Sequence, residues 1–302
     1  MSDATRNAPR DAMSGATGNA TRDRQAPLLE VEDLQIELIT DRGVVRAVDG
    51  VGFTLAAGET VTLIGESGSG KSTTAMGLLR LLPEGLAVLS GTARVRGVDV
   101  VADPRAARRI RGRGVSLIPQ DPMTALSPVH TIGRQLGEAL RIRHPELSRA
   151  DARAKGIELL GRVRIPHPET RWGAYPHQFS GGMLQRVLIA IALAAEPELL
   201  IADEPTSALD VTVQAGVLDL LMELQERTGI GILMITHDLG VARLVSDRIH
   251  VMRDGRFVES GPVEQIVEHP AEAYTRDLLA AVPTLGPWDE TPATASPEEA
   301  SP

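Results

Sequence analysis

Residues 28–64 alternate apolar and polar positions in the manner of antiparallel β-structure. Leu29, Val31 and Leu34 begin this alternation. Further apolar stretches of strand length follow at 44–48, 51–55 and 61–64, and residues 92–101 predict another pair of strands. Because successive side chains of a strand point to opposite faces, the spacing predicts strands with one buried face.

From residue 131 onward the apolar spacing changes to that of helices. Ile132, Leu136 and Leu140 share one helical face, and residues 157, 160 and 163 share another, which predicts helical structure over 131–165. Other helices are predicted at 72–82, 180–195, 211–227 and 271–281. Short apolar strands are predicted at 199–202, 230–236, 249–252 and 256–258. Strands that alternate with helices favour an α/β fold with a mainly parallel sheet.

The two ends of the chain differ from the part between them. Residues 1–26 lack large apolar side chains and residues 286–302 are rich in Pro, Glu, Ser and Thr, so both are predicted to be disordered tails. The first 26 residues show no secretion signal. The longest apolar stretch, Val187–Ala195, is too short to cross a bilayer, so work at a membrane would need a partner.

Composition narrows the classes of function. The formal net charge of -9 disfavours a broad nucleic-acid footprint, and the absence of cysteine excludes disulfides, thiolate metal sites and cysteine nucleophiles. Lysine occurs only at positions 71 and 155, which makes the place of Lys71 informative.

A glycine-rich segment between a predicted strand and a predicted helix fits the phosphate-loop pattern G-x-x-x-x-G-K-[ST]. Its residues, with the one that follows, are Gly65, Glu66, Ser67, Gly68, Ser69, Gly70, Lys71, Ser72 and Thr73. Glycines let successive N–H groups turn toward phosphate oxygens, and the helix N-terminus adds to the anion site. Lys71 is predicted to reach the β- and γ-phosphates, and the Ser72 hydroxyl to bind Mg²⁺. Alone, the segment indicates a nucleotide hydrolase or kinase of the phosphate-loop class.

Two acids follow the apolar strand at 199–202. Asp203 is a candidate Mg²⁺ ligand and Glu204 a candidate general base for the attacking water. Strand ends are where open α/β sheets bind ligands, although an acidic pair in that position is also common in simple turns.

Four more segments accompany these two features in a characteristic order. They are Pro119–Pro122, Phe179–Arg186, Ser207–Asp210 and Ile235–Asp238. Together they resemble the Q-loop, signature segment, D-loop and switch histidine of ABC ATPases, over roughly residues 28–282. The resemblance implies a phosphate-loop α/β fold with a mainly parallel core sheet, an antiparallel β subdomain and an α-helical subdomain. It places the nucleotide-binding domain at 27–262, with its helical subdomain at about 121–180.

The same resemblance implies a division of roles between two chains. Lys71, Ser72, Gln120, Asp203, Glu204 and His237 would serve ATP bound on this chain, with Ser72, Gln120 and Asp203 around Mg²⁺. Ser180, Gly181 and Gly182 would contact ATP held by the partner chain, and Asp210 would link the two sites. A plain helix cap at Ser180 and an ordinary loop histidine at 237 are the alternative interpretations. No aromatic residue suited to stack on adenine is evident, and Arg42 is the candidate for that place.

Several stretches resemble ATP-binding subunits of oligopeptide, dipeptide and nickel importers. These are residues 65–70, 120–128 and 179–183, and an extension at 263–285 that contains His269-Pro270 and Tyr274–Leu279. That extension usually has His-Pro directly before Tyr-Thr, whereas Glu272-Ala273 stand there in this chain.

The resemblance to importer subunits also implies partners and a location for this chain. It implies a second ATPase subunit, identical or different, two membrane permease subunits, and indirectly a solute-binding protein, with this chain peripheral on the cytoplasmic face of the membrane. Nucleic acid is not expected as a partner. An exporter ATPase, a soluble non-transport ABC protein and a regulatory subunit that does not hydrolyse ATP are the alternatives. The transported solute is left open among peptides, nickel, opines and sugars.

Overall fold

A six-stranded sheet forms the centre of the molecule in the computed structural model, which describes residues 26–207 and 209–281. Its strand order is β10-β9-β3-β8-β7-β6. The strands are β3 (Thr60–Ile64), β6 (Val115–Ile118), β7 (Leu199–Asp203), β8 (Gly231–Thr236), β9 (Arg248–Arg253) and β10 (Arg256–Pro262). All neighbours pair in parallel except β9 with β10. Every residue of β3, β7 and β8 is buried, as expected of a parallel sheet covered on both faces.

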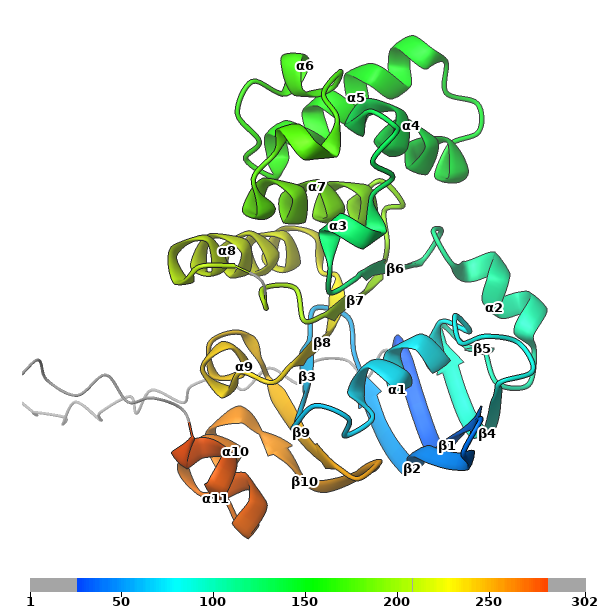
Figure 1. The fold of residues 1–302 in the computed structure, drawn as a ribbon, viewed down its shortest axis with the longest axis vertical. Helices are drawn as coiled ribbons and strands as arrows, with labels where there is room; N and C mark the ends of the chain where they lie inside the picture. The colour runs from blue at the N-terminus through cyan, green and yellow to red at the C-terminus, as the bar shows by residue number, and fades with distance from the viewer. Residues whose placement is uncertain (1–25, 208, 282–302) are drawn as a thin grey trace, which may run out of the picture.

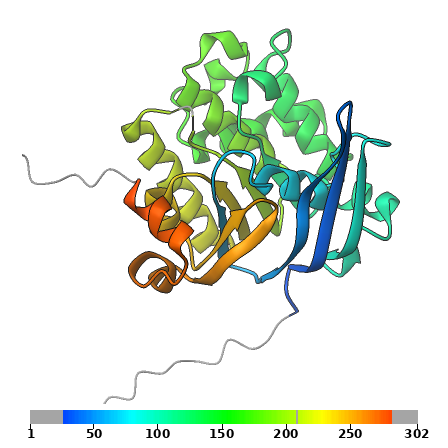
Figure 2. The same cartoon turned by 60° about the horizontal axis from the view of Figure 1, so that its bottom comes forward.

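A second, antiparallel sheet lies beside the first (Figures 1 and 2). Its order is β2-β1-β4-β5, formed by β1 (Leu29–Thr40), β2 (Gly43–Leu55), β4 (Ala87–Val95) and β5 (Val98–Asp99). The predicted alternation buries Leu29, Val31 and Leu34. These side chains share one apolar core with Leu63 of β3 and with residues of β7 and β8, so the two sheets are packed as one unit.

Helices pack around the central sheet (Figure 1). They are α1 (Lys71–Leu78), α2 (Pro104–Ile110), α3 (Pro122–Ala125), α4 (Ile132–Arg143), α5 (Arg149–Arg162), α6 (Pro168–Arg171), the 3₁₀ turn η1 (Pro176–Gln178), α7 (Gly181–Leu193), α8 (Val211–Thr228), α9 (Leu239–Val245), α10 (Val263–Glu268) and α11 (Ala273–Ala280). α3 to α7 form a helical region at the top of Figure 1, where Ile132, Leu136 and Leu140 enter a core with α7 and α8. None of the described helices combines the length and the apolarity needed to cross a bilayer.

The C-terminal helices pack against the edge of the central sheet. Ile266 of α10 shares a small core with Ile249 and Val251 of β9, and Tyr274 and Leu278 of α11 pack against it. Figures 1 and 2 show α10 and α11 side by side next to β9 and β10. The extension predicted at 263–285 is therefore seated on the sheet as far as it is described.

The predicted α/β fold with its parallel core, antiparallel subdomain and helical part is confirmed. The helix predicted at 72–82 ends earlier, at Leu78, because the chain turns through Arg80, which has a left-handed φ of 51°. The predicted tails at 1–26 and 286–302 lie outside the described residues, apart from residue 26. The domain boundaries at 27–262 and 263–285 stay predictions.

Candidate nucleotide site

The glycine-rich loop connects the buried strand β3 to α1. Gly65 and Gly70 have φ values of 152° and 108°, and a Cβ at either position would collide with a backbone carbonyl oxygen, of Met252 and Ala47 respectively. Glycine is therefore required there both for backbone conformation and for space. A cavity of about 180 Å³ opens at the loop, lined by Ala47, Ser67, Gly68, Gly70, Lys71, Ser72, Thr73, Gln120 and Glu204.

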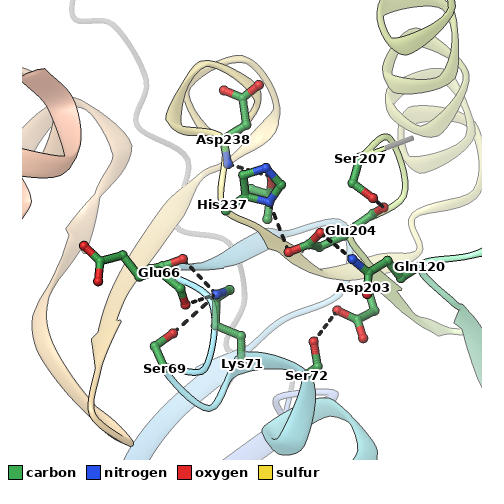
Figure 3. A network of polar contacts seen from close by, with 12 residues as sticks. Glu66, Ser69, Lys71, Ser72, Gln120, Asp203, Glu204, Ser207, His237 and Asp238 are labelled. Carbon is green, nitrogen blue, oxygen red and sulfur yellow. Dashed lines mark hydrogen bonds and ion pairs between the residues drawn. The ribbon is translucent and has the colours of Figure 1, made fainter. Parts of the chain in front are cut away.

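Lys71 lies at the first position of α1, and its side chain curls back into the loop (Figure 3). Its Nζ donates to the carbonyl oxygens of Gly65 and Glu66, each at 2.8 Å, and to Ser69 Oγ at 3.3 Å. Burial lowers the pKa of this ammonium group, and the carboxylates of Glu204, Asp203 and Glu66 oppose that effect. The site thus holds a cation beside two acids, a charge pattern suited to phosphates and Mg²⁺ together.

Asp203 is the last residue of β7 and points toward α1. The Ser72 hydroxyl donates to its Oδ1 at 2.9 Å (Figure 3). Burial raises the pKa of Asp203 and the Glu204 charge adds to the increase, whereas Ser72 and Lys71 oppose it. A hydroxyl and a carboxylate oxygen on adjacent elements fit Mg²⁺, which takes one or two protein oxygens and completes its shell with water and phosphate.

Glu204 follows β7 in a left-handed backbone conformation, with φ 46°. For a residue other than glycine this conformation costs about 1–3 kcal/mol, and such strain is typical of functional sites. Its N–H donates to Ile235 O at 2.9 Å, which ties the turn to β8. Its carboxylate accepts from Gln120 Nε2 at 2.8 Å and lies 3.1 Å from His237 Nδ1 (Figure 3). Three segments that are distant in sequence therefore meet at one carboxylate.

The signature and D-loop residues occupy other positions. Ser180 caps α7 by accepting from Met183 N–H at 3.4 Å, and Asp210 caps α8 by accepting from Val213 N–H at 3.0 Å. A Cβ on Gly182 would collide with Val213, so this glycine allows α7 and α8 to pack closely. Among the described residues, the cavity lining includes neither of the two caps nor Gly181 and Gly182, and their contact with ATP on a second chain stays a prediction.

Arg42 lies in the turn between β1 and β2 and is exposed. Within the described chain, the cavity lining includes Ala47 of β2 and does not include Arg42. The contact of Arg42 with adenine therefore stays a prediction. Ala47 was not foreseen as part of the site because a lone alanine in a strand carries no chemical signal.

Comparison with known proteins identifies the family. Residues 48–207 match the model of the ABC transporter family. A putative peptide import ATP-binding protein of Brucella abortus is 49% identical over 264 residues, which covers 87% of this chain and 79% of that protein. The peptidoglycan transport ATP-binding protein YejF of Agrobacterium fabrum is 52% identical over 259 residues, 85% of this chain and 47% of that longer protein.

Solved structures agree with this assignment. The dimeric, post-hydrolysis ATP-binding cassette MJ0796 with ADP and Pi superposes with a TM-score of 0.70 at 26% identity, covering 78% of this chain and 98% of that one. The cbiO1 subunit of a Clostridium perfringens ABC transporter complex has a TM-score of 0.67 at 26% identity, covering 81% and 92%. The chain belongs to the ABC transporter family, and it is an ATP-binding, ATP-hydrolysing member of it.

Proposed function

We propose that the chain is the ATP-hydrolysing subunit of a peptide importer. The observation that carries the proposal is that Gln120 and His237 meet at the carboxylate of Glu204, and that Gln120 and Glu204 line the phosphate-loop cavity. The names of the Brucella and Agrobacterium relatives, which refer to peptide import and peptidoglycan transport, support a peptide as the solute.

Each residue of the nucleotide site has its own role in the proposed hydrolysis of ATP. Lys71, held in the loop by the carbonyl oxygens of Gly65 and Glu66, binds the β- and γ-phosphates, and the loop N–H groups bind the remaining phosphate oxygens. Ser72 and Asp203 hold Mg²⁺, with Gln120 beside them. When bound there, Mg²⁺ would neutralise charge that develops on the phosphates. Glu204 accepts a proton from the attacking water, and His237 holds Glu204 and the γ-phosphate in place.

The helix caps supply the second half of the site. Ser180 and the N-terminal N–H groups of α7 face the γ-phosphate of ATP bound to a second ATPase subunit. Two ATP molecules then close two subunits around themselves, and hydrolysis lets them separate. Because each state makes different contacts, ATP binding shifts the equilibrium between open and closed forms. Two permease subunits on the cytoplasmic face of the membrane receive this movement.

The test is co-purification. The tagged chain carrying Glu204→Gln is isolated with ATP in mild detergent, and its partners are identified by mass spectrometry. Two permease-like membrane proteins, with peptide uptake that depends on the chain in cells, are the expected result. Ribosomal or DNA-repair partners without membrane proteins would overturn the transport assignment and leave the ATPase standing.

A further inference from the structure

The phosphate loop is contacted from outside by the C-terminal extension. The backbone N–H of Glu66 donates to the hydroxyl oxygen of Tyr274 at 3.1 Å, across 208 positions of sequence. Tyr274 lies in the first turn of α11. A residue far from the nucleotide segments in sequence therefore touches the loop that holds the phosphates.

The ring of Tyr274 and the start of α11 are fixed by neighbouring side chains. The Arg253 guanidinium lies 4.9 Å from the centre of the Tyr274 ring. The Glu259 carboxylate accepts from the N–H groups of Ala271 at 2.8 Å and Glu272 at 3.2 Å, which fixes the start of α11 on β10. The adjacent Thr275 is completely buried. The extension thus presents the hydroxyl from a fixed helix, as precise positioning requires.

Glu66 connects this contact to the catalytic lysine. While its N–H is bound to Tyr274, its carbonyl oxygen accepts from Lys71 Nζ at 2.8 Å and from Ser69 N–H at 3.2 Å. The far side of the loop is tied separately, by the N–H of Gly255 to Ser69 O at 3.0 Å. A shift of residue 66 would therefore move a carbonyl that holds Lys71 as well as the loop itself.

We propose that Tyr274 is a positioning residue for ATP, which acts through the Glu66 peptide to keep the phosphate loop in its binding conformation. The proposal rests on the assignment of this loop as the ATP site. In this account the C-terminal extension is part of the nucleotide site's support, and its loss changes ATP affinity as well as stability.

The first test is Tyr274→Phe, which removes the hydroxyl and keeps the ring between α11 and Arg253. Loss of one neutral hydrogen bond predicts an increase of about twofold to tenfold in KM for ATP, with kcat and Tm nearly unchanged. Thr228→Val is the control, because it removes a hydroxyl bound to a carbonyl at the end of α8, remote from the loop. An unchanged KM in Tyr274→Phe would overturn the proposal.

The second test separates the N–H from the side chain of residue 66. Glu66→Ala keeps the N–H and Glu66→Pro removes it. Tyr274→Phe is expected to raise KM in the Glu66→Ala background and to have no further effect in the Glu66→Pro background. An equal effect in both backgrounds would show that Tyr274 acts by another route and would overturn the proposal.

Two further comparisons cover a Tyr274→Phe variant that does not fold and a failure of the ATP-site assignment. If Tyr274→Phe does not fold, KM is compared between Glu66→Pro and Glu66→Ala alone: a higher KM for Pro supports the proposal, and equal values contradict it. Lys71→Ala in the same assay tests the ATP site itself. If Lys71→Ala leaves ATP binding intact, the assignment of the loop as the ATP site fails, and the proposal fails with it. If Lys71→Ala abolishes ATP binding but Tyr274→Phe leaves KM for ATP unchanged, only the proposal about Tyr274 is overturned.

Discussion

The Nδ1 atom of His237 lies 3.1 Å from Oε1 of Glu204, while Gln120 donates to Oε2 of the same carboxylate at 2.8 Å. The three residues follow β8, β7 and β6, which are adjacent parallel strands. Because parallel strands end at the same edge, three loops from distant parts of the chain converge there. The Glu204 side chain is only 15% exposed, so its two neighbours restrict the directions in which it can point.

His237→Ala is expected to lower ATP hydrolysis by about 100-fold, the usual cost of removing one group that orients or stabilises the transition state. The affinity for ATP should change much less, because Lys71 and the loop N–H groups remain. Steady-state hydrolysis and equilibrium nucleotide binding measure the two effects. His269→Ala is the matched control, since that histidine is exposed at the end of α10. Equal hydrolysis by the two variants would refute a role for His237.

Lys71→Ala is expected to weaken ATP binding by about 100-fold or more, because a buried charge that pairs with phosphate is lost. The chain provides its own control in Lys155, the other lysine, which is exposed on α5. Lys155→Ala should bind ATP as the wild type does. Calorimetric titration with ATP and Mg²⁺ measures both, and similar affinities in the two variants would contradict the site.

Gly182→Ala tests whether the signature glycine serves packing, ligand approach or both. The added Cβ collides with Val213 across the α7–α8 contact, so we expect a loss of stability of about 1–3 kcal/mol. Val213→Ala makes room for it. The double variant should regain stability, and a hydrolysis rate that stays low would support the proposed contact of Gly182 with ATP held by a partner chain. Full recovery of hydrolysis would mean that Gly182 serves packing alone.

His250 makes stability depend on pH. Burial, together with the nearby Arg248 charge, lowers the pKa of His250 from 6.5 to about 4, although Glu59 acts in the opposite direction. Between these values the unfolded chain binds a proton that the folded chain does not, so the free energy of unfolding falls as pH decreases from about 6.5 to about 4. The loss over this range is on the order of 3 kcal/mol.

His250→Phe removes that titration while keeping an aromatic ring beside Phe257, whose ring stacks on His250 at 4.7 Å. Urea denaturation at several pH values should give a flatter profile between pH 6.5 and 4 than the wild type shows. A variant whose stability decreases as steeply as that of the wild type would contradict the account.

Local patterns predicted the central elements well. The strands at 199–202 and 230–236 and the helix at 211–227 are present within one or two residues, because long apolar runs and caps such as Asp210 fix them. α2 was not foreseen, because it is short and arginine-rich and buries only two alanines. β6 was missed because its four residues follow a stretch dominated by arginine and glycine.

The sequence predicted those site residues that lie in recognisable segments, but not the contacts that depend on how distant elements pack. Lys71, Ser72, Gln120 and Glu204 line one cavity. The phosphate-loop pattern and the acids after an apolar strand pointed to Lys71, Ser72 and Glu204, and the resemblance to ABC ATPases pointed to Gln120. The contact of Tyr274 with Glu66 depends on how α11 packs on β9 and β10, which local periodicity does not encode. The hydrogen bond of Gln120 to Glu204 likewise depends on the order of strands in the sheet.

The measurement that most directly tests the account is ATP hydrolysis by Glu204→Gln, combined with light scattering in ATP. The amide keeps the size of the side chain but cannot accept the proton of the attacking water, so hydrolysis should fall by at least about 100-fold. ATP should still bind, and the molar mass should shift from monomer toward dimer. Steady-state hydrolysis equal to that of the wild type would contradict the assignment of Glu204 as the base.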